Sequence, residues 1–144
     1  METETIQNAV RKVEQAPADA DVRTVRRMEI GQAIQQGDVY LHRVPDNHPR
    51  GKQIGMDSVQ IALGSGNGAR HMAEGAVRVF AGCRLPEGVS APLNVEAAEV
   101  TGPVVVADKP WTLTHPEHPH HKLPAGTYQT TYQYDPQTMR RVQD

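Results

Sequence analysis

The chain has 144 residues, a single cysteine, and 15 Lys plus Arg against 17 Asp plus Glu, for a formal net charge of −2. This length suits one domain with an appendage, and one cysteine excludes both an intramolecular disulfide and a cysteine-based zinc site. The near balance of charges argues against general electrostatic binding to nucleic acid or to an anionic membrane.

The first residues, Met-Glu-Thr-Glu, lack the basic start and apolar run of a signal peptide. No apolar stretch approaches the length of a membrane span. We therefore expect a protein that is neither secreted nor embedded in a membrane, and that works in the cytoplasm or as part of a virion.

Residues 1–35 are predicted to form an N-terminal arm, helical or extended. Ile6, Ala9, Val10 and Val13 recur at helical spacing and indicate a short amphipathic helix, which Pro17 ends. The apolar stripe is narrow and the helix spans about three turns, so it is marginal in isolation and should dock on another surface.

The second part of the arm carries apolar residues spaced by three, namely Val22, Val25 and Met28. This spacing predicts either a short helix capped by Asp21 or an extended segment. Three arginines lie among them: Arg23, Arg26 and Arg27. They would either meet phosphate or an acidic partner surface or form a solvated face, and the balanced total charge favours the solvated face.

From Gly37 onward the pattern changes to the period of two that indicates strands, so a β-domain is predicted over residues 36–144. We expect strands near residues 38–44, 59–63, 77–80, 93–97, 103–107, 111–115 and 128–134. About seven strands with short connections predict an all-β fold, either a small barrel or a jelly-roll-like sandwich. Trp111 and Leu113 share one strand face, which should be buried. Since these strands would supply their own core, residues 1–35 should be dispensable for folding.

The segment from His115 to His121 holds four of the seven histidines of the chain. Imidazole is a ligand for zinc, copper, nickel and iron, and a site needs three or four groups converging on the ion. Pro116 and Pro119 favour an extended segment with a rise of ~3.1 Å per residue, which would separate His115 from His121 by roughly 18 Å. At most a neighbouring pair would then reach one ion.

A metal site would therefore use His118 with His120 or His121, or a bend that also brings in His115, together with a donor from another segment, such as His71. The ion would be a transition metal, zinc first among the candidates. The alternative is a solvated loop made rigid by proline, and in that case no cofactor is expected.

Other motifs for catalysis are missing from the sequence. The prolines exclude the helical His-Glu-x-x-His arrangement of metalloproteases, no Gly-x-Ser-x-Gly is present, and Cys83 has no base near it in the sequence. Gly64–Gly68 would form either an anion-binding nest or a flexible connection between strands, and the connection is favoured because no phosphate-loop ending follows. No catalytic residue is predicted.

Four segments resemble a set of short uncharacterised proteins encoded by bacteria and tailed phages. They are the strand Gln36-Gly-Asp-Val-Tyr-Leu-His-Arg-Val44, a His-rich strand after it, the turn Leu123-Pro-Ala-Gly-Thr-Tyr128 and the ending from Tyr134 to Asp144. The resemblance implies a small β-domain and carries no catalytic assignment.

These observations favour a structural or interaction protein of a homo-oligomeric assembly, such as the cement or decoration protein of a phage capsid or another virion component. We expect the arm to bind a neighbouring copy or a shell protein through Ile6, Val10, Val13, Val22, Val25, Arg23, Arg26 and Arg27. No membrane and no specific nucleic acid is expected as a partner. The alternative is a metal-dependent β-barrel enzyme or a metal-binding protein that uses the cluster at residues 115–121.

Overall fold

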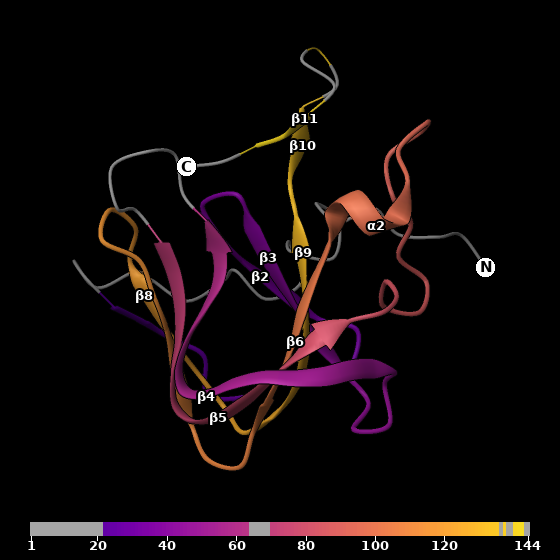
Figure 1. The fold of residues 1–144 in the computed structure, drawn as a ribbon. Coiled ribbons are helices and arrows are strands. Elements are labelled where there is room, and N and C mark those ends of the chain that lie inside the picture. The colour runs from indigo at the N-terminus through magenta and orange to yellow at the C-terminus, as the bar shows by residue number, and fades with distance from the viewer. Residues whose placement is uncertain (1–21, 64–69, 136, 138–139, 143–144) are drawn as a thin grey trace.

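The structure is a computed structural model that describes residues 22–63, 70–135, 137 and 140–142. Within these ranges nearly all of the regular secondary structure is strand, which confirms the predicted all-β class, and nine strands form one sheet that curls into a half barrel (Figure 1). The strands of the sheet are β1 (Val22–Thr24), β2 (Ala33–Gln36), β3 (Val39–Val44), β4 (Arg50–Leu63), β5 (Arg70–Gly82), β6 (Thr101–Ala107), β7 (Trp111–Thr114), β8 (His120–Leu123) and β9 (Gly126–Tyr132). A separate antiparallel pair is formed by β10 (Tyr134–Asp135) and β11 (Arg140–Arg141).

Strand β5 divides the sheet into two wings. It pairs with β4 along one side, whereas on the other side Met72–Glu74 pair with β7 and Val77–Phe80 pair with β6. Gly75 lies between these halves with φ 127°, and a side chain there would lie 3.4 Å from the Cα of Trp111. This positive φ and close approach suit glycine. The wings are β7-β8-β1 and β6-β9-β3-β2.

The main core combines apolar side chains from both wings. Trp111 is 2% exposed and Leu113 is fully buried, so the prediction that their shared face is buried is confirmed. The indole of Trp111 packs edge-on against the ring of Tyr128 on β9, with 5.4 Å between ring centroids. Contacts of this kind join the two wings and stabilise the curled sheet.

The described part of the predicted arm belongs to the sheet and its core. β1 pairs in parallel with β8, and β2 pairs antiparallel with β3. Met28, Ala33 and Ile34 are buried, and Val25 packs against the main core. The prediction of an arm separate from the domain therefore does not hold for residues 22–35, because the edge of β8 offers hydrogen-bond partners that local spacing does not reveal. Ile6, Val10 and Val13 lie outside the described residues.

Two further segments differ from the expected strands. Residues 93–97 contain a turn, with Asn94 at φ 63°, followed by the short helix α2 (Ala97–Val100), instead of a strand. Strand β4 begins at Arg50, well before the predicted start at residue 59. The prediction missed the first half of the strand because most side chains there are exposed and no alternation of apolar residues marks it. In the described ranges no helix has the length and apolar character needed to cross a membrane.

Candidate functional site

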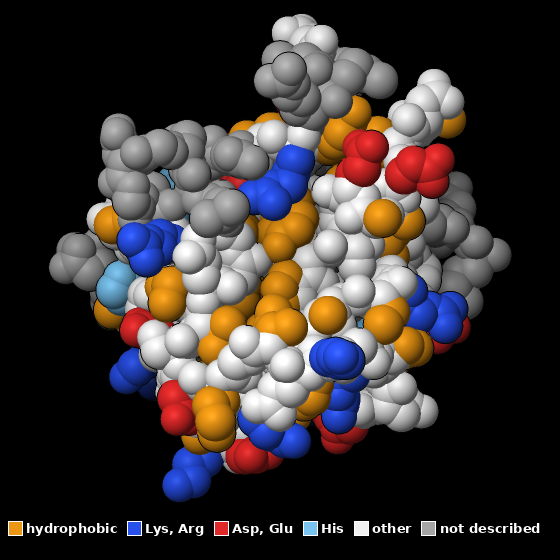
Figure 2. Space-filling model, viewed as in Figure 1, with side chains coloured by type: hydrophobic (Ala, Val, Ile, Leu, Met, Phe, Trp, Pro, Cys, Tyr) orange, Lys and Arg blue, Asp and Glu red, His pale blue; other side chains and the backbone are white. Residues whose placement is uncertain are grey.

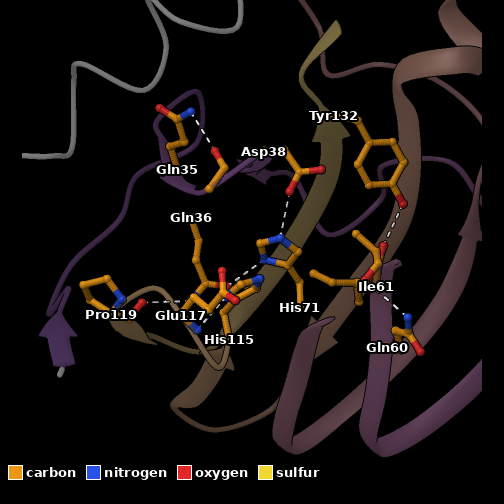
Figure 3. A network of polar contacts seen from close by, with 12 residues as sticks. Gln35, Gln36, Asp38, Gln60, Ile61, His71, His115, Glu117, Pro119 and Tyr132 are labelled. Atoms are coloured by element: carbon orange, nitrogen blue, oxygen red, sulfur yellow. Dashed lines mark hydrogen bonds and ion pairs between the residues drawn. The ribbon is translucent and has the colours of Figure 1, made fainter. Parts of the chain in front are cut away.

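A network of buried polar side chains lies where the β2–β3 turn, the start of β5 and the β7–β8 loop meet (Figure 3). His71 on β5 is fully buried at its centre. Its Nδ1 lies 2.9 Å from Oε1 of Gln36, and its Nε2 lies 2.8 Å from Oδ1 of Asp38. Gln36 and Asp38 flank Gly37, whose φ of 56° allows the tight turn between β2 and β3.

The side-chain amide of Gln36 determines which ring nitrogen of His71 donates a proton to it. Its Nε2 donates to the carbonyl oxygens of Leu113, at 3.0 Å, and Pro119, at 2.9 Å, so its Oε1 faces His71 and accepts the proton of Nδ1. The other ring nitrogen then shares one proton with the carboxyl group of Asp38, whose side chain is also fully buried. Gln36 thereby ties β2 to both ends of the β7–β8 connection.

Two histidines of the predicted cluster lie beside His71. The ring centroids of His71 and His115 are 4.4 Å apart, those of His115 and His118 are 4.4 Å apart, and those of His71 and His118 are 6.4 Å apart. Nδ1 of His115 accepts the backbone N–H of Glu117 at 3.0 Å, which makes Nε2 the protonated nitrogen of a neutral ring.

The expected straight segment from His115 to His121 is wrong. β7 and β8 form an antiparallel hairpin in which Leu113 lies opposite His121, so the chain reverses direction between them. The pairing of β8 with both β7 and β1 outweighs the preference of Pro116 and Pro119 for an extended conformation. This bend brings His115 and His118 together, and β5 supplies His71 from outside the segment.

His121 lies on β8 and is 3% exposed. Within the described part of the chain neither of its ring nitrogens has a hydrogen-bond partner. Burial first, and then the charges of Arg23, His118 and His120, lower the pKa of His121 to about 4. The ring is therefore neutral at pH 7, and the lone pair of its unprotonated nitrogen accepts no hydrogen bond from the described residues.

The metal hypothesis stays a prediction. Both ring nitrogens of His71 are hydrogen-bonded, so His71 would have to leave Gln36 or Asp38 before it bound an ion. Among the residues described by the structure, no group of three or more His, Cys, Asp or Glu is placed to hold a metal ion together. His118, His120 and His121 are neighbours along the chain, but His120 and His121 alternate across the strand β8.

Residues 35–133 match the family defined by a domain of unknown function, DUF8820. The chain belongs to this family. The match confirms the resemblance to an uncharacterised family, and no curated protein and no solved structure matches the chain. The DUF8820 segment contains Gln36, Asp38, His71 and the whole stretch from His115 to His121, so the entire polar network lies within the family domain.

A second buried polar group in the DUF8820 segment was not predicted as a site. Gln129 on β9 donates through Nε2 to the carbonyl oxygens of Gly102, at 2.7 Å, and Thr130, at 2.9 Å, and its Oε1 lies 2.9 Å from Nε2 of His48. Nearby, Nε2 of His42 lies 2.8 Å from Oγ1 of Thr131, and burial lowers the pKa of His42 to about 4. The sequence signal was available in β9, where polar residues occupy both faces of a strand between buried tyrosines.

Proposed function

We propose that this DUF8820 protein is a structural or interaction protein that assembles with further copies of itself, and that β4 contributes the contact surface. The observation that supports this most is the exposure of β4. It is a strand of 14 residues that pairs with β5 along one side, and no strand within the described ranges pairs with its other side. Long open edges of this kind are where one sheet can meet another chain.

The side chains of β4 favour an apolar contact. In the described part of the chain four large apolar side chains are more than half exposed, and two of them, Ile54 at 55% and Met56 at 58%, lie on β4. The face seen in Figure 2 carries hydrophobic side chains in its middle, with charged side chains of both signs around them. An apolar centre with a charged rim is common at protein interfaces.

The form of β4 also limits how it pairs. Its register with β5 shifts at four places, and Asp57 has φ 67°. Bulges and charged residues such as Lys52 are the devices by which edge strands avoid uncontrolled pairing. We therefore expect a defined contact, made largely by side chains, instead of a continuous ladder of backbone hydrogen bonds with the neighbouring copy.

The buried network supports a structural role for the histidines. Two surface hollows, one lined by Trp111 and Lys122 and the other by Arg43 and Arg78, include none of the network residues. A catalytic group needs access to its substrate, and His71 is fully buried between protein partners. The resemblance to proteins of bacteria and tailed phages supports a phage capsid or another part of a virion as the place of this assembly.

The test is a set of surface variants of the full chain. Met56→Glu and Ile54→Glu should lower the mass of the assembled protein toward that of one chain, because each places a charge in an apolar contact. Leu93→Glu is the matched control, since Leu93 is 90% exposed and lies on another segment, and it should assemble like the parent protein. Equal assembly of all three variants would show that β4 is not the interface.

A second candidate function is metal binding by His118 with His120 or His121. It is favoured by His121, whose ring is neutral at pH 7 and has no described hydrogen-bond partner at either nitrogen. Elemental analysis of protein purified without chelator tests it. An ion near one equivalent that is lost in His121→Ala supports the candidate, and less than about a tenth of an equivalent contradicts it, because a built site holds its ion tightly.

A further inference from the structure

A surface hollow of about 470 Å³ lies between the β3–β4 loop and the adjoining ends of β5, β6 and β9. It includes none of the residues of the histidine network. Its polar lining consists of three arginines, two aspartates and a threonine: Arg43, Arg50, Arg78, Asp46, Asp108 and Thr127. The arginines come from β3, from β4 and from β5, and of these three strands β4 and β5 pair with each other.

The guanidinium group of Arg43 is held in place by the backbone. Its Nη1 donates to the carbonyl oxygen of Val44 at 2.7 Å, and its Cζ lies 5.8 Å from the ring centroid of Tyr128. Gly126, at φ 151°, provides the space, because a Cβ at that position would overlap the guanidinium. Nε of Arg43 is buried and has no hydrogen-bond partner among the described residues. A buried donor of this kind gains from an acceptor in the hollow.

The other two guanidinium groups lie over one aromatic ring. Cζ of Arg50 is 4.7 Å and Cζ of Arg78 is 5.9 Å from the ring centroid of Phe80. Arg50 also donates through Nη1 to the carbonyl oxygen of Asp46 at 3.2 Å. Cation–π and backbone contacts fix two like charges near each other before any ligand arrives, which lowers the entropy cost of binding an anion.

The carboxylates of the hollow neutralise the arginines only in part, since Asp108 forms a long, solvent-exposed ion pair with Arg78. Oδ1 of Asp108 lies 3.7 Å from Nη2 of Arg78, beyond hydrogen-bond distance, and both side chains are well exposed to solvent. Oδ1 of Asp46 accepts the hydroxyl proton of Thr127 at 3.0 Å. Three guanidinium groups against two carboxylates leave a net positive charge, and each guanidinium has N–H donors beyond those used by the protein.

We propose that this hollow binds a phosphate group, either as inorganic phosphate or as part of a phosphorylated small molecule. Phosphate fits better than a carboxylate because its three or four oxygens accept from guanidinium groups on several sides, whereas the two oxygens of a carboxylate are satisfied by one arginine. The site is independent of the proposed assembly through β4, although Arg50 belongs to the same strand.

Isothermal titration of the full chain with inorganic phosphate and with phenyl phosphate tests the site. We expect saturable binding with one equivalent, weakened at least about tenfold in Arg78→Gln and in Arg50→Gln. Arg27→Gln is the control, because Arg27 is exposed, pairs with Glu29 and lies outside the hollow; it should bind like the parent protein. Melting temperatures close to that of the parent show that a variant is folded, and Arg78→Lys replaces any variant that is not.

The outcomes separate the two sources of phosphate. Equal affinity for both probes assigns free phosphate, and tighter binding of phenyl phosphate assigns a phosphorylated molecule. No saturable binding of either probe overturns the proposal, as does binding that is the same in Arg78→Gln, Arg50→Gln and the control.

Discussion

Asp38 and His71 form a fully buried pair, with Oδ1 of the carboxyl group 2.8 Å from Nε2 of the ring, although 33 positions separate them in the sequence. The pair connects the β2–β3 turn to the start of β5, and the second ring nitrogen of His71 extends the connection to Gln36 and from there to the β7–β8 loop. The β2–β3 turn, β5 and the β7–β8 loop are thus held together by polar contacts as well as by the apolar core.

Replacing Asp38 by alanine should destabilise the protein strongly. The change leaves the Nε2 side of His71 buried without its acid partner, and loss of one member of a buried pair typically costs ~3–5 kcal/mol in the free energy of unfolding. Urea denaturation measures this value. Asp108→Ala is the control, since its side chain is 72% exposed and should change stability by less than about 0.5 kcal/mol. A loss below about 1 kcal/mol in Asp38→Ala would mean that the pair does not hold the turn.

Stability should fall as the pH is lowered from about 6.5 toward 4. Burial lowers the pKa of both His42 and His121 to about 4 in the folded protein. The unfolded chain, in which histidine titrates near 6.5, therefore binds more protons in this window, so acid favours unfolding by up to about 1.4 kcal/mol per pH unit for each ring. Above pH 6.5 this contribution is fully present and no longer changes.

Urea denaturation between pH 7 and 5, above the range in which most carboxyl groups titrate, measures the effect. His42→Gln should have a shallower slope than the parent protein. A slope unchanged by the substitution would show that His42 is accessible to protons in the folded state.

Trp111→Ala should lower the melting temperature by about ten degrees or more, because removal of a buried aromatic ring costs ~3–5 kcal/mol. The ring is 2% exposed and packs against Tyr128 across the two wings. Leu93→Ala, at a residue that is 90% exposed, should melt within two or so degrees of the parent protein. Similar melting of both variants would place Trp111 outside the stabilising core.

Two truncations separate the described strands from the residues before them. A chain that starts at Val22 keeps every described contact of β1 and β2 and should melt cooperatively. A chain that starts at Gln36 loses Met28, Ala33 and Ile34 from the core and should not fold, which reverses the expectation from sequence that residues 1–35 are dispensable. Circular dichroism with thermal melting checks both, and cooperative melting of the shorter chain would contradict the structure.

The sequence predicts those parts of the fold in which one strand carries its own pattern. Trp111 and Leu113 mark a buried face because alternation along β7 is local information. By contrast, β1 is short and forms by pairing with the edge of β8, and the first half of β4 is exposed, so neither carries the alternating apolar pattern of a strand. The hairpin that joins His115 to His118 depends on the register of β7 with β8, which lies beyond what local spacing shows.

The candidate site was predictable only in part. His71, His115 and His118 were proposed among the ligands of a metal site, which stays a prediction, and the structure places the ring centroid of His115 4.4 Å from those of His71 and His118. Gln36 and Asp38 were not proposed as members, because an amide and a carboxyl group in a turn are ordinary until the fold places a buried ring against them.

The assembly of the parent protein is the central claim, and its mass in solution over a range of concentrations tests it most directly. Light scattering or sedimentation of the full chain should give a defined multiple of 15.8 kDa, and that multiple should be lost in Met56→Glu. A mass of one chain at every concentration, from micromolar to submillimolar, would contradict the proposal that this protein assembles with copies of itself.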